Sequence, residues 1–168
     1  MKRYILISLV FWIGARETFS QNILDGVKGS IYQLNSFANG EDSFAFGWNN
    51  DVLNDDSGAL GFGNEITQKE SYAFGRYNDI IGGTRILVIG QNNIYNGGSD
   101  GFVFGAGNDV SGSGVLYQTA IGHFNTISGY AGFALGTSNE VSQSNGIALG
   151  QGLLINATSP TYAMALGK

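Results

Sequence analysis

A short motif of apolar and small residues that ends in glycine recurs nine times along the chain. The first copy reads Phe44-Ala45-Phe46-Gly47 and the last reads Met164-Ala165-Leu166-Gly167. Successive motif-ending glycines are 14, 14, 15, 15, 17, 14, 14 and 17 residues apart. A period this short and regular is typical of a solenoid, in which each unit packs only on its neighbours.

A second, weaker motif lies between the copies of the first: Asn, followed two residues later by an apolar residue. It begins at Asn50, Asn64, Asn78, Asn93, Asn108, Asn125 and Asn139. Over long stretches the two motifs alternate every seven residues, as in Ala45, Val52 and Ala59. A heptad can indicate a coiled coil, but repeated glycine is costly in helices and the flanking Phe, Tyr, Val and Ile favour strands. We therefore predict one short strand and one turn per seven residues, and a coil of about 14 residues.

Strand alternation predicts which side chains face the interior. If Ala45 points inward, the glycine two residues later does too, and the bulky residues on either side of Ala45 point outward. In the other half-coil Asn50 and Val52 point inward together, because the opposite choice would bury Asp51 as an unpaired carboxylate. The predicted interior sets Ala on one strand against Val or Ile on the other.

The asparagines are expected at the turns, as a structural ladder rather than a ligand site. Asn tolerates left-handed backbone angles, and its amide can satisfy turn backbone groups in the coil above or below. Insertions interrupt the seven-residue spacing at four places, where we expect variable surface loops. They fall at residues 81–84, 96–99, 111–116 and 156–161.

The outward bulky residues are apolar in every coil. Nine coils at the ~4.8 Å strand spacing make a stripe about 40 Å long, and soluble monomers rarely expose such a patch. We therefore predict a homo-oligomer. Its interface is predicted to contain Phe44, Phe46, Leu60, Phe74, Ile89, Phe104, Ile121, Leu135 and Leu149.

The N-terminal segment predicts that the chain is exported. Residues 1–20 contain Lys2, Arg3 and an apolar run too short to span a bilayer, which predicts a secretory signal peptide; a buried or membrane-anchoring N-terminal helix is the alternative. Five Lys or Arg and twelve Asp or Glu remain without this segment, so the net charge is −7. The scattered cations offer no basic stripe for nucleic acid, and a chain without cysteine has no disulfides.

The segment Asn35-Ser36-Phe37-Ala38-Asn39-Gly40, with the later echoes Ser57–Gly61 and Ser71–Gly75, resembles the head repeats of YadA-type trimeric autotransporter adhesins. Their pattern is Asn-Ser-x-Ala-x-Gly with Ser-x-Ala-x-Gly echoes, and the likeness covers residues 35–167. It implies left-handed parallel β-rolls, three side by side, displayed on bacterial surfaces and binding host matrix proteins or cells. The leading serine is lost or shifted in later copies, and the outward face is unusually aromatic. Surface anchoring is not implied, because no neck, stalk or barrel pattern follows the ninth copy.

Catalytic and metal chemistry find little support in the sequence. His123 is the single histidine and takes a repeat position that other coils fill with Trp48 or Thr137, so we expect an outward turn residue, not a catalytic base. Residues 75–83 and 105–110 resemble fragments of calcium-binding nonapeptide repeats, but their period is wrong for that class. A solenoid enzyme acting on polysaccharide would need clustered carboxylates, and an ice-binding solenoid a threonine ladder. No cofactor, zinc site or enzyme activity is expected.

The repeats predict an all-β parallel solenoid of ~14-residue coils. The resemblance implies that this is a left-handed parallel β-roll and that it forms a homotrimer. We assign residues 1–20 to a signal peptide, 21–34 to a lead-in segment and 35–168 to head repeats. The predicted function is that of an exported adhesin head at the outer membrane, cell surface or outside the cell. Its partners would be further copies of itself and a host matrix protein or cell surface. The alternative is a non-binding spacer module of a longer fibre.

Overall fold

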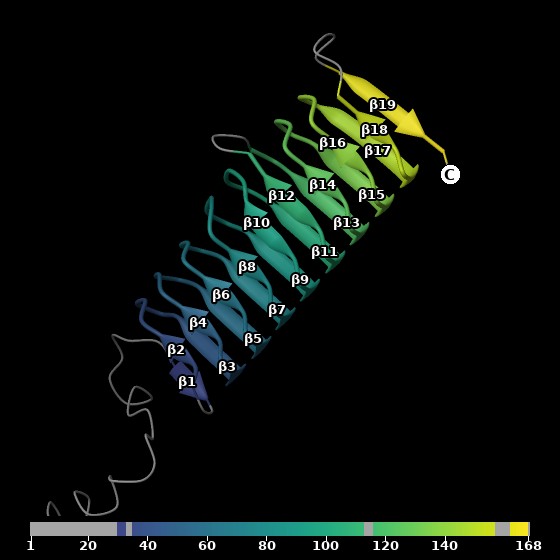
Figure 1. Cartoon of the computed structure of the whole chain (residues 1–168). Helices are drawn as coiled ribbons and strands as arrows, with labels where there is room; N and C mark the ends of the chain where they lie inside the picture. The colour runs from purple at the N-terminus through teal and green to yellow at the C-terminus, as the bar shows by residue number, and fades with distance from the viewer. Residues whose placement is uncertain (1–29, 33–34, 113–115, 157–161, 168) are drawn as a thin grey trace, which may run out of the picture.

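The chain folds into a parallel β-solenoid whose coils stack along one axis (Figure 1). The computed structural model describes residues 30–32, 35–112, 116–156 and 162–167. The predicted signal peptide and most of the lead-in segment lie outside these residues. The described part contains no helix, and therefore none that could cross a membrane. The predicted all-β solenoid is confirmed.

Two parallel sheets form the long sides of the solenoid, and each coil contributes one strand to each sheet. Sheet A consists of β1 (Ser30–Tyr32), β3 (Phe44–Trp48), β5 (Gly58–Phe62), β7 (Tyr72–Arg76), β9 (Leu87–Gln91), β11 (Phe102–Ala106), β13 (Thr119–His123), β15 (Phe133–Thr137), β17 (Gly146–Gln151) and β19 (Ala163–Leu166). Sheet B consists of β2 (Phe37–Ala38), β4 (Asp51–Val52), β6 (Glu65–Ile66), β8 (Asp79–Ile80), β10 (Ile94–Asn96), β12 (Asp109–Ser111), β14 (Thr126–Ile127), β16 (Glu140–Val141) and β18 (Leu154–Ile155). Sheet A begins at Ser30, within the segment set apart as a lead-in.

The core lies between the two sheets and has the predicted composition. Ala45 and Ala59 are register partners in sheet A and are fully buried. Val52 and Ile66 are register partners in sheet B and are equally inaccessible. Small side chains on one sheet thus face medium ones on the other, so the two sheets can approach closely.

Tyr95 is the exception in this core, because it stands where other coils carry Val or Ile, yet it is fully buried. Space for its ring comes from Gly101, where a Cβ would overlap the Tyr95 ring. The phenol donates a hydrogen bond to the carbonyl oxygen of Gly98 at 2.8 Å. Burial raises the pKa of the Tyr95 hydroxyl, so the group stays neutral and keeps donating.

The motif-ending glycines mark the closest approach between coils. Gly90 has a φ of 134°, and a Cβ there would overlap the carbonyl oxygen of Gly105 in the next coil. A side chain is therefore excluded both by the backbone conformation and by the neighbouring coil. The same two constraints apply to the first eight motif-ending glycines, and they are the physical reason that those copies end in glycine.

The asparagines form a buried ladder along one corner of the solenoid. The Nδ2 of Asn64 donates to the Oδ1 of Asn50 at 2.8 Å and to the carbonyl oxygen of Gly75 at 3.0 Å. The Oδ1 of Asn64 in turn accepts from the backbone N–H of Asn78 at 3.2 Å. The prediction that these amides satisfy backbone groups of neighbouring coils is confirmed.

The prediction that the ladder asparagines themselves take left-handed backbone angles is wrong. Positive φ occurs at the residue before each ladder asparagine, as at Asn49 with 55° and Tyr77 with 53°. The ladder residue itself takes an ordinary conformation, because its side chain must point into the interior beside the following Val or Ile.

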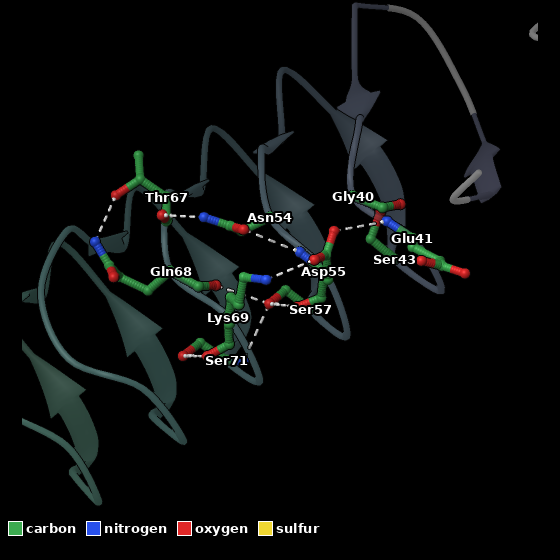
Figure 2. Close-up of polar contacts among 10 residues, drawn as sticks. All are labelled: Gly40, Glu41, Ser43, Asn54, Asp55, Ser57, Thr67, Gln68, Lys69 and Ser71. Carbon is green, nitrogen blue, oxygen red and sulfur yellow. Dashed lines mark hydrogen bonds and ion pairs between the residues drawn. The ribbon is translucent and has the colours of Figure 1, made fainter. Parts of the chain in front are cut away.

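The opposite corner, between each strand of sheet B and the next strand of sheet A, is held by polar side chains. Figure 2 shows Ser57, whose hydroxyl donates to the carbonyl oxygen of Gln68 at 2.8 Å, and Lys69, which is paired with Asp55 at 2.7 Å. In chain order each of the four predicted insertions falls between a sheet B strand and the following sheet A strand, and residues 81–84 and 97–99 lie at this corner. Two of them stack, with the hydroxyls of Thr84 and Ser99 2.9 Å apart; residues 113–115 and 157–161 lie outside the described part.

Candidate oligomer interface

The outer face of sheet A carries one apolar residue per coil in a single straight column. Parallel pairing places these residues side by side across neighbouring strands. We call this set the central column: Phe46, Leu60, Phe74, Ile89, Phe104, Ile121, Leu135, Leu149 and Leu166. Apart from Leu166, these are predicted interface residues, and the structure brings them together.

The central column is open to solvent in the single chain. Leu60 and Phe104 are each 50% exposed, and Phe74 and Ile89 are half-buried. Strand alternation explains this, because the inner face at the same strands is occupied by the core alanines and valines. A continuous exposed apolar strip of this length is typical of a surface that is covered in the functional assembly.

A second column runs beside the first, two residues earlier in each strand, and contains the remaining predicted residue, Phe44. The ring of Phe44 lies over Gly58, where a Cβ would overlap it, and reaches Tyr72 with ring centroids 6.1 Å apart. Gly58 itself adds no side chain to the second column, but the Phe44 ring covers its place. The two columns contain no charged residue among the described strands of sheet A, so covering them would desolvate no charge.

The outer face of sheet B is mixed and carries charge. One column there holds Asp51, Glu65, Asp79, Asp109 and Glu140, together with the exposed apolar residues Phe37, Ile94 and Leu154. Burial raises the pKa of the Asp51 and Asp79 carboxyls above the usual range. Because like charges repel, two such faces do not suit each other, and sheet A is the face better suited to self-association.

Ion pairs occupy the corner that connects sheet B to sheet A. Arg85 binds Asp100, with Nε 2.6 Å from Oδ1 and Nη2 2.9 Å from Oδ2. Hydrogen bonds from Lys69 and Arg85 lower the pKa of Asp55 and Asp100 respectively. These pairs link neighbouring coils and leave the apolar columns of sheet A free of charge.

The position after the motif-ending glycine, which the sequence predicts to point outward at His123, forms a third column on the same face, two residues after the central one. The sequence did not predict the ring contact at the start of this column. The column begins with Trp48 and Phe62, whose rings lie 6.3 Å apart, and continues with Arg76. Strand alternation, continued past the motif-ending glycine, places this position on the outer face of sheet A.

The structure also places the residues that the sequence raised as candidates for catalytic or metal chemistry. His123 is exposed at the end of β13, beside its register partners Ala106 and Thr137. Its predicted outward position is confirmed, but His123 belongs to the strand and not to a turn. Within the described residues no group of three or more His, Cys, Asp or Glu side chains is arranged to hold a metal ion.

Comparison with known proteins identifies the repeats themselves. Residues 34–50 and 128–152 match the family model of the YadA head domain repeat, in two copies. No curated protein and no solved structure matches the chain. The first matched stretch contains the Asn35-Ser36 segment, and the second spans β15 to β17. The matched repeats and the parallel β-solenoid are consistent with a YadA-type head, an adhesin-type β-roll module.

Proposed function

We propose, starting from these YadA head repeats, that the protein is the head of an exported bacterial surface adhesin. In this proposal three copies assemble through the apolar columns of sheet A, and the assembly attaches to host matrix or cells. The function is adhesive and not enzymatic. The proposed location is the cell surface or the extracellular space.

The observation that carries the proposal is the central column, which stays exposed and uncharged in the single chain. Burying apolar surface contributes roughly 25 cal/mol per Å². The columns run through every coil, so the favourable term is added once per coil, while the entropy of association is lost once per copy. A long, repeated stripe is therefore well suited to hold parallel copies together.

Light scattering of the purified full chain tests the assembly. We expect the wild type to have the mass of three copies. The double variant Leu60→Lys, Phe104→Lys should have the mass of one copy, because Leu60 and Phe104 are each 50% exposed in the single chain and a lysine at either position would place a charge in the interface. The matched control is Leu53→Lys, Leu154→Lys, two similarly exposed positions on the side of sheet B. A monomeric wild type, or equal dissociation by both pairs, would contradict the proposal.

Attachment is measured on wells coated with collagen, fibronectin or laminin and on cultured epithelial cells. We expect the wild type to be retained and the monomeric variant to be retained less, because three linked sites bind with higher avidity than one. A trimer that binds none of these surfaces would contradict the adhesive role and favour the alternative of a spacer module.

A further inference from the structure

Three aromatic residues from successive coils form a cluster on the surface, at the corner where sheet A turns towards sheet B. We call Trp48, Phe62 and Tyr77 the aromatic cluster. The rings of Trp48 and Phe62 are 6.3 Å apart, and those of Phe62 and Tyr77 are 5.0 Å apart and nearly perpendicular at 83°. Trp48 and Tyr77 each remain 51% exposed. The rings thus hold one another in place and still present surface to solvent.

The fold does not require aromatic residues at these positions, and the repeats provide the internal control. At the strand position of Trp48 and Phe62, later strands of sheet A carry Gln91, Ala106, His123, Thr137 and Gln151. Strands β9, β11, β13 and β15 are five residues long like β3 and β5, and they pair in the same way. The cluster is therefore a local departure from the repeat, made where exposure of apolar rings is unfavourable.

Tyr77 is also placed in an unfavourable backbone conformation. Its φ is 53°, whereas the equivalent positions of the two adjacent coils hold Gly63 and Asn92, which adopt left-handed angles more readily. The Tyr77 ring lies over Gly63, where a Cβ would come within 2.8 Å of Tyr77 Cδ1. Phe124 over Gly107 repeats this backbone arrangement, with a φ of 54°. What is particular to Tyr77 is the edge contact of its ring with Phe62.

The chemistry around the rings indicates the kind of ligand. Arg76 and Gln91 are exposed beside the cluster and share a hydrogen bond of 3.1 Å from Nη2 to Oε1. Aromatic faces pack against the C–H faces of sugar rings, while amide and guanidinium groups can bond to sugar hydroxyls. The net charge of −5 for the whole chain disfavours an anionic ligand.

We propose that the aromatic cluster is a binding site for a neutral oligosaccharide. The site rests on the adhesive role proposed above and gives that role a class of ligand. The sugar would lie along the solenoid axis across three coils, with its C–H faces on Trp48 and Tyr77 and its hydroxyls towards Arg76 and Gln91.

Isothermal titration of the full chain with cellohexaose and with chitohexaose tests this site. The double variant Trp48→Gln, Tyr77→Asn introduces the residue types that later coils hold at these positions, so the solenoid should remain intact, as thermal melting would verify. The matched control is Phe124→Asn, which changes a 67% exposed aromatic residue at the turn position of Tyr77, five coils away from Trp48 in the strand order. We expect the wild type to bind at least one probe, the double variant to bind at least tenfold more weakly, and the control to bind like the wild type.

Three outcomes would overturn the oligosaccharide site. They are a wild type that binds neither probe, equal affinity of wild type and double variant, and loss of the trimer mass in the double variant, which would make the cluster a contact between copies. The cell-attachment assay distinguishes failure of the oligosaccharide site from failure of the proposed adhesive role. If the wild type attaches to cells but binds neither probe, the adhesive role stands and the sugar site fails. If the wild type binds sugar but attaches to no surface, the site stands and the adhesive role fails.

Discussion

At the scale of single residues, the interior asparagines connect each coil to the coils on both sides. Asn93 donates from Nδ2 to Asn78 Oδ1 and to the Gly105 carbonyl oxygen, each at 2.9 Å. Its Oδ1 accepts from the backbone N–H and the Nδ2 of Asn108, each at 3.0 Å. Both Asn93 and Asn108 are inaccessible to water, so a broken bond here is not replaced by a bond to solvent. The ladder therefore couples neighbouring coils more specifically than apolar packing can.

We predict that Asn93→Ala destabilises the protein by about 2–6 kcal/mol, because two buried groups, the Gly105 carbonyl oxygen and the Asn108 N–H, lose this partner at about 1–3 kcal/mol each. The measurement is denaturant unfolding followed by circular dichroism. Asn96→Ala in the same coil is the control, because Asn96 is exposed and surface changes are usually within about 0.5 kcal/mol. Equal stability of the two variants would show that the ladder contributes little.

At the scale of elements, the strands of the two sheets have the same role in the core but different outer faces. Strands β4, β6 and β8 bring Asp51, Glu65 and Asp79 together because parallel pairing puts equivalent residues side by side. The Oδ1 atom of Asp51 is buried without a hydrogen-bond partner. The charged form of Asp51 and Asp79 is thus disfavoured by burial, which raises the pKa of both carboxyls. Alternation within one strand decides the face, and register between strands decides which charges meet.

We predict that Asp51→Asn, Asp79→Asn stabilises the protein at pH 7. Burial raises the folded-state pKa of both carboxyls, so their favourable contribution is present below the unfolded pKa and is lost as the pH rises through the folded pKa. The gain at pH 7 should be ~0.2–1 kcal/mol per site, the size of a cross-strand charge pair, and should vanish near pH 3. Thermal melting of wild type and variant from pH 3 to pH 7 measures it.

The substitution Asp55→Asn should have the opposite effect on stability at pH 7. The hydrogen bond from Lys69 lowers the pKa of Asp55, so that carboxylate stabilises the fold above its unfolded pKa and ceases to do so as the pH falls through the folded value. Its replacement should lower the melting temperature at pH 7 and leave it unchanged in strong acid. A melting temperature of the double variant that falls at pH 7 would contradict the burial argument.

At the scale of the whole molecule, the solenoid is a one-dimensional stack. Sheet A pairs strands in the order β1, β3, β5 and onward, so each coil contacts chiefly the coil before and the coil after it. Stability in such stacks is approximately a sum of unit terms and nearest-neighbour terms. The structure therefore tolerates a change in the number of coils better than a change in the phase of one coil.

We predict that deletion of residues 123–136, one complete coil, leaves a folded solenoid. The deletion joins Gly122 to Thr137, and Thr137 is the register partner of the removed His123, so both sheets continue in phase. We expect a β-rich circular dichroism spectrum and a single melting transition a few degrees lower. Deletion of residues 123–129, half a coil, should instead lower the melting temperature much further, because the strands after the deletion would fall on the wrong sheet and only the coils before it could stack in register. If both deletions melt alike, the coil is not the unit of stability.

The sequence by itself determined the period, the all-β class, the inward Ala, Val and Ile, and the outward apolar column, since alternation is a property of each strand alone. The Asn35-Ser36 segment also identified the repeat family. Only the tertiary structure decided which turn residue takes positive φ, how Gly101 makes room for Tyr95, and that Trp48, Phe62 and Tyr77 meet. These features depend on contacts between residues of successive coils, about one repeat apart. Such contacts are set by the register between strands, and the register follows from how every turn and insertion closes its coil.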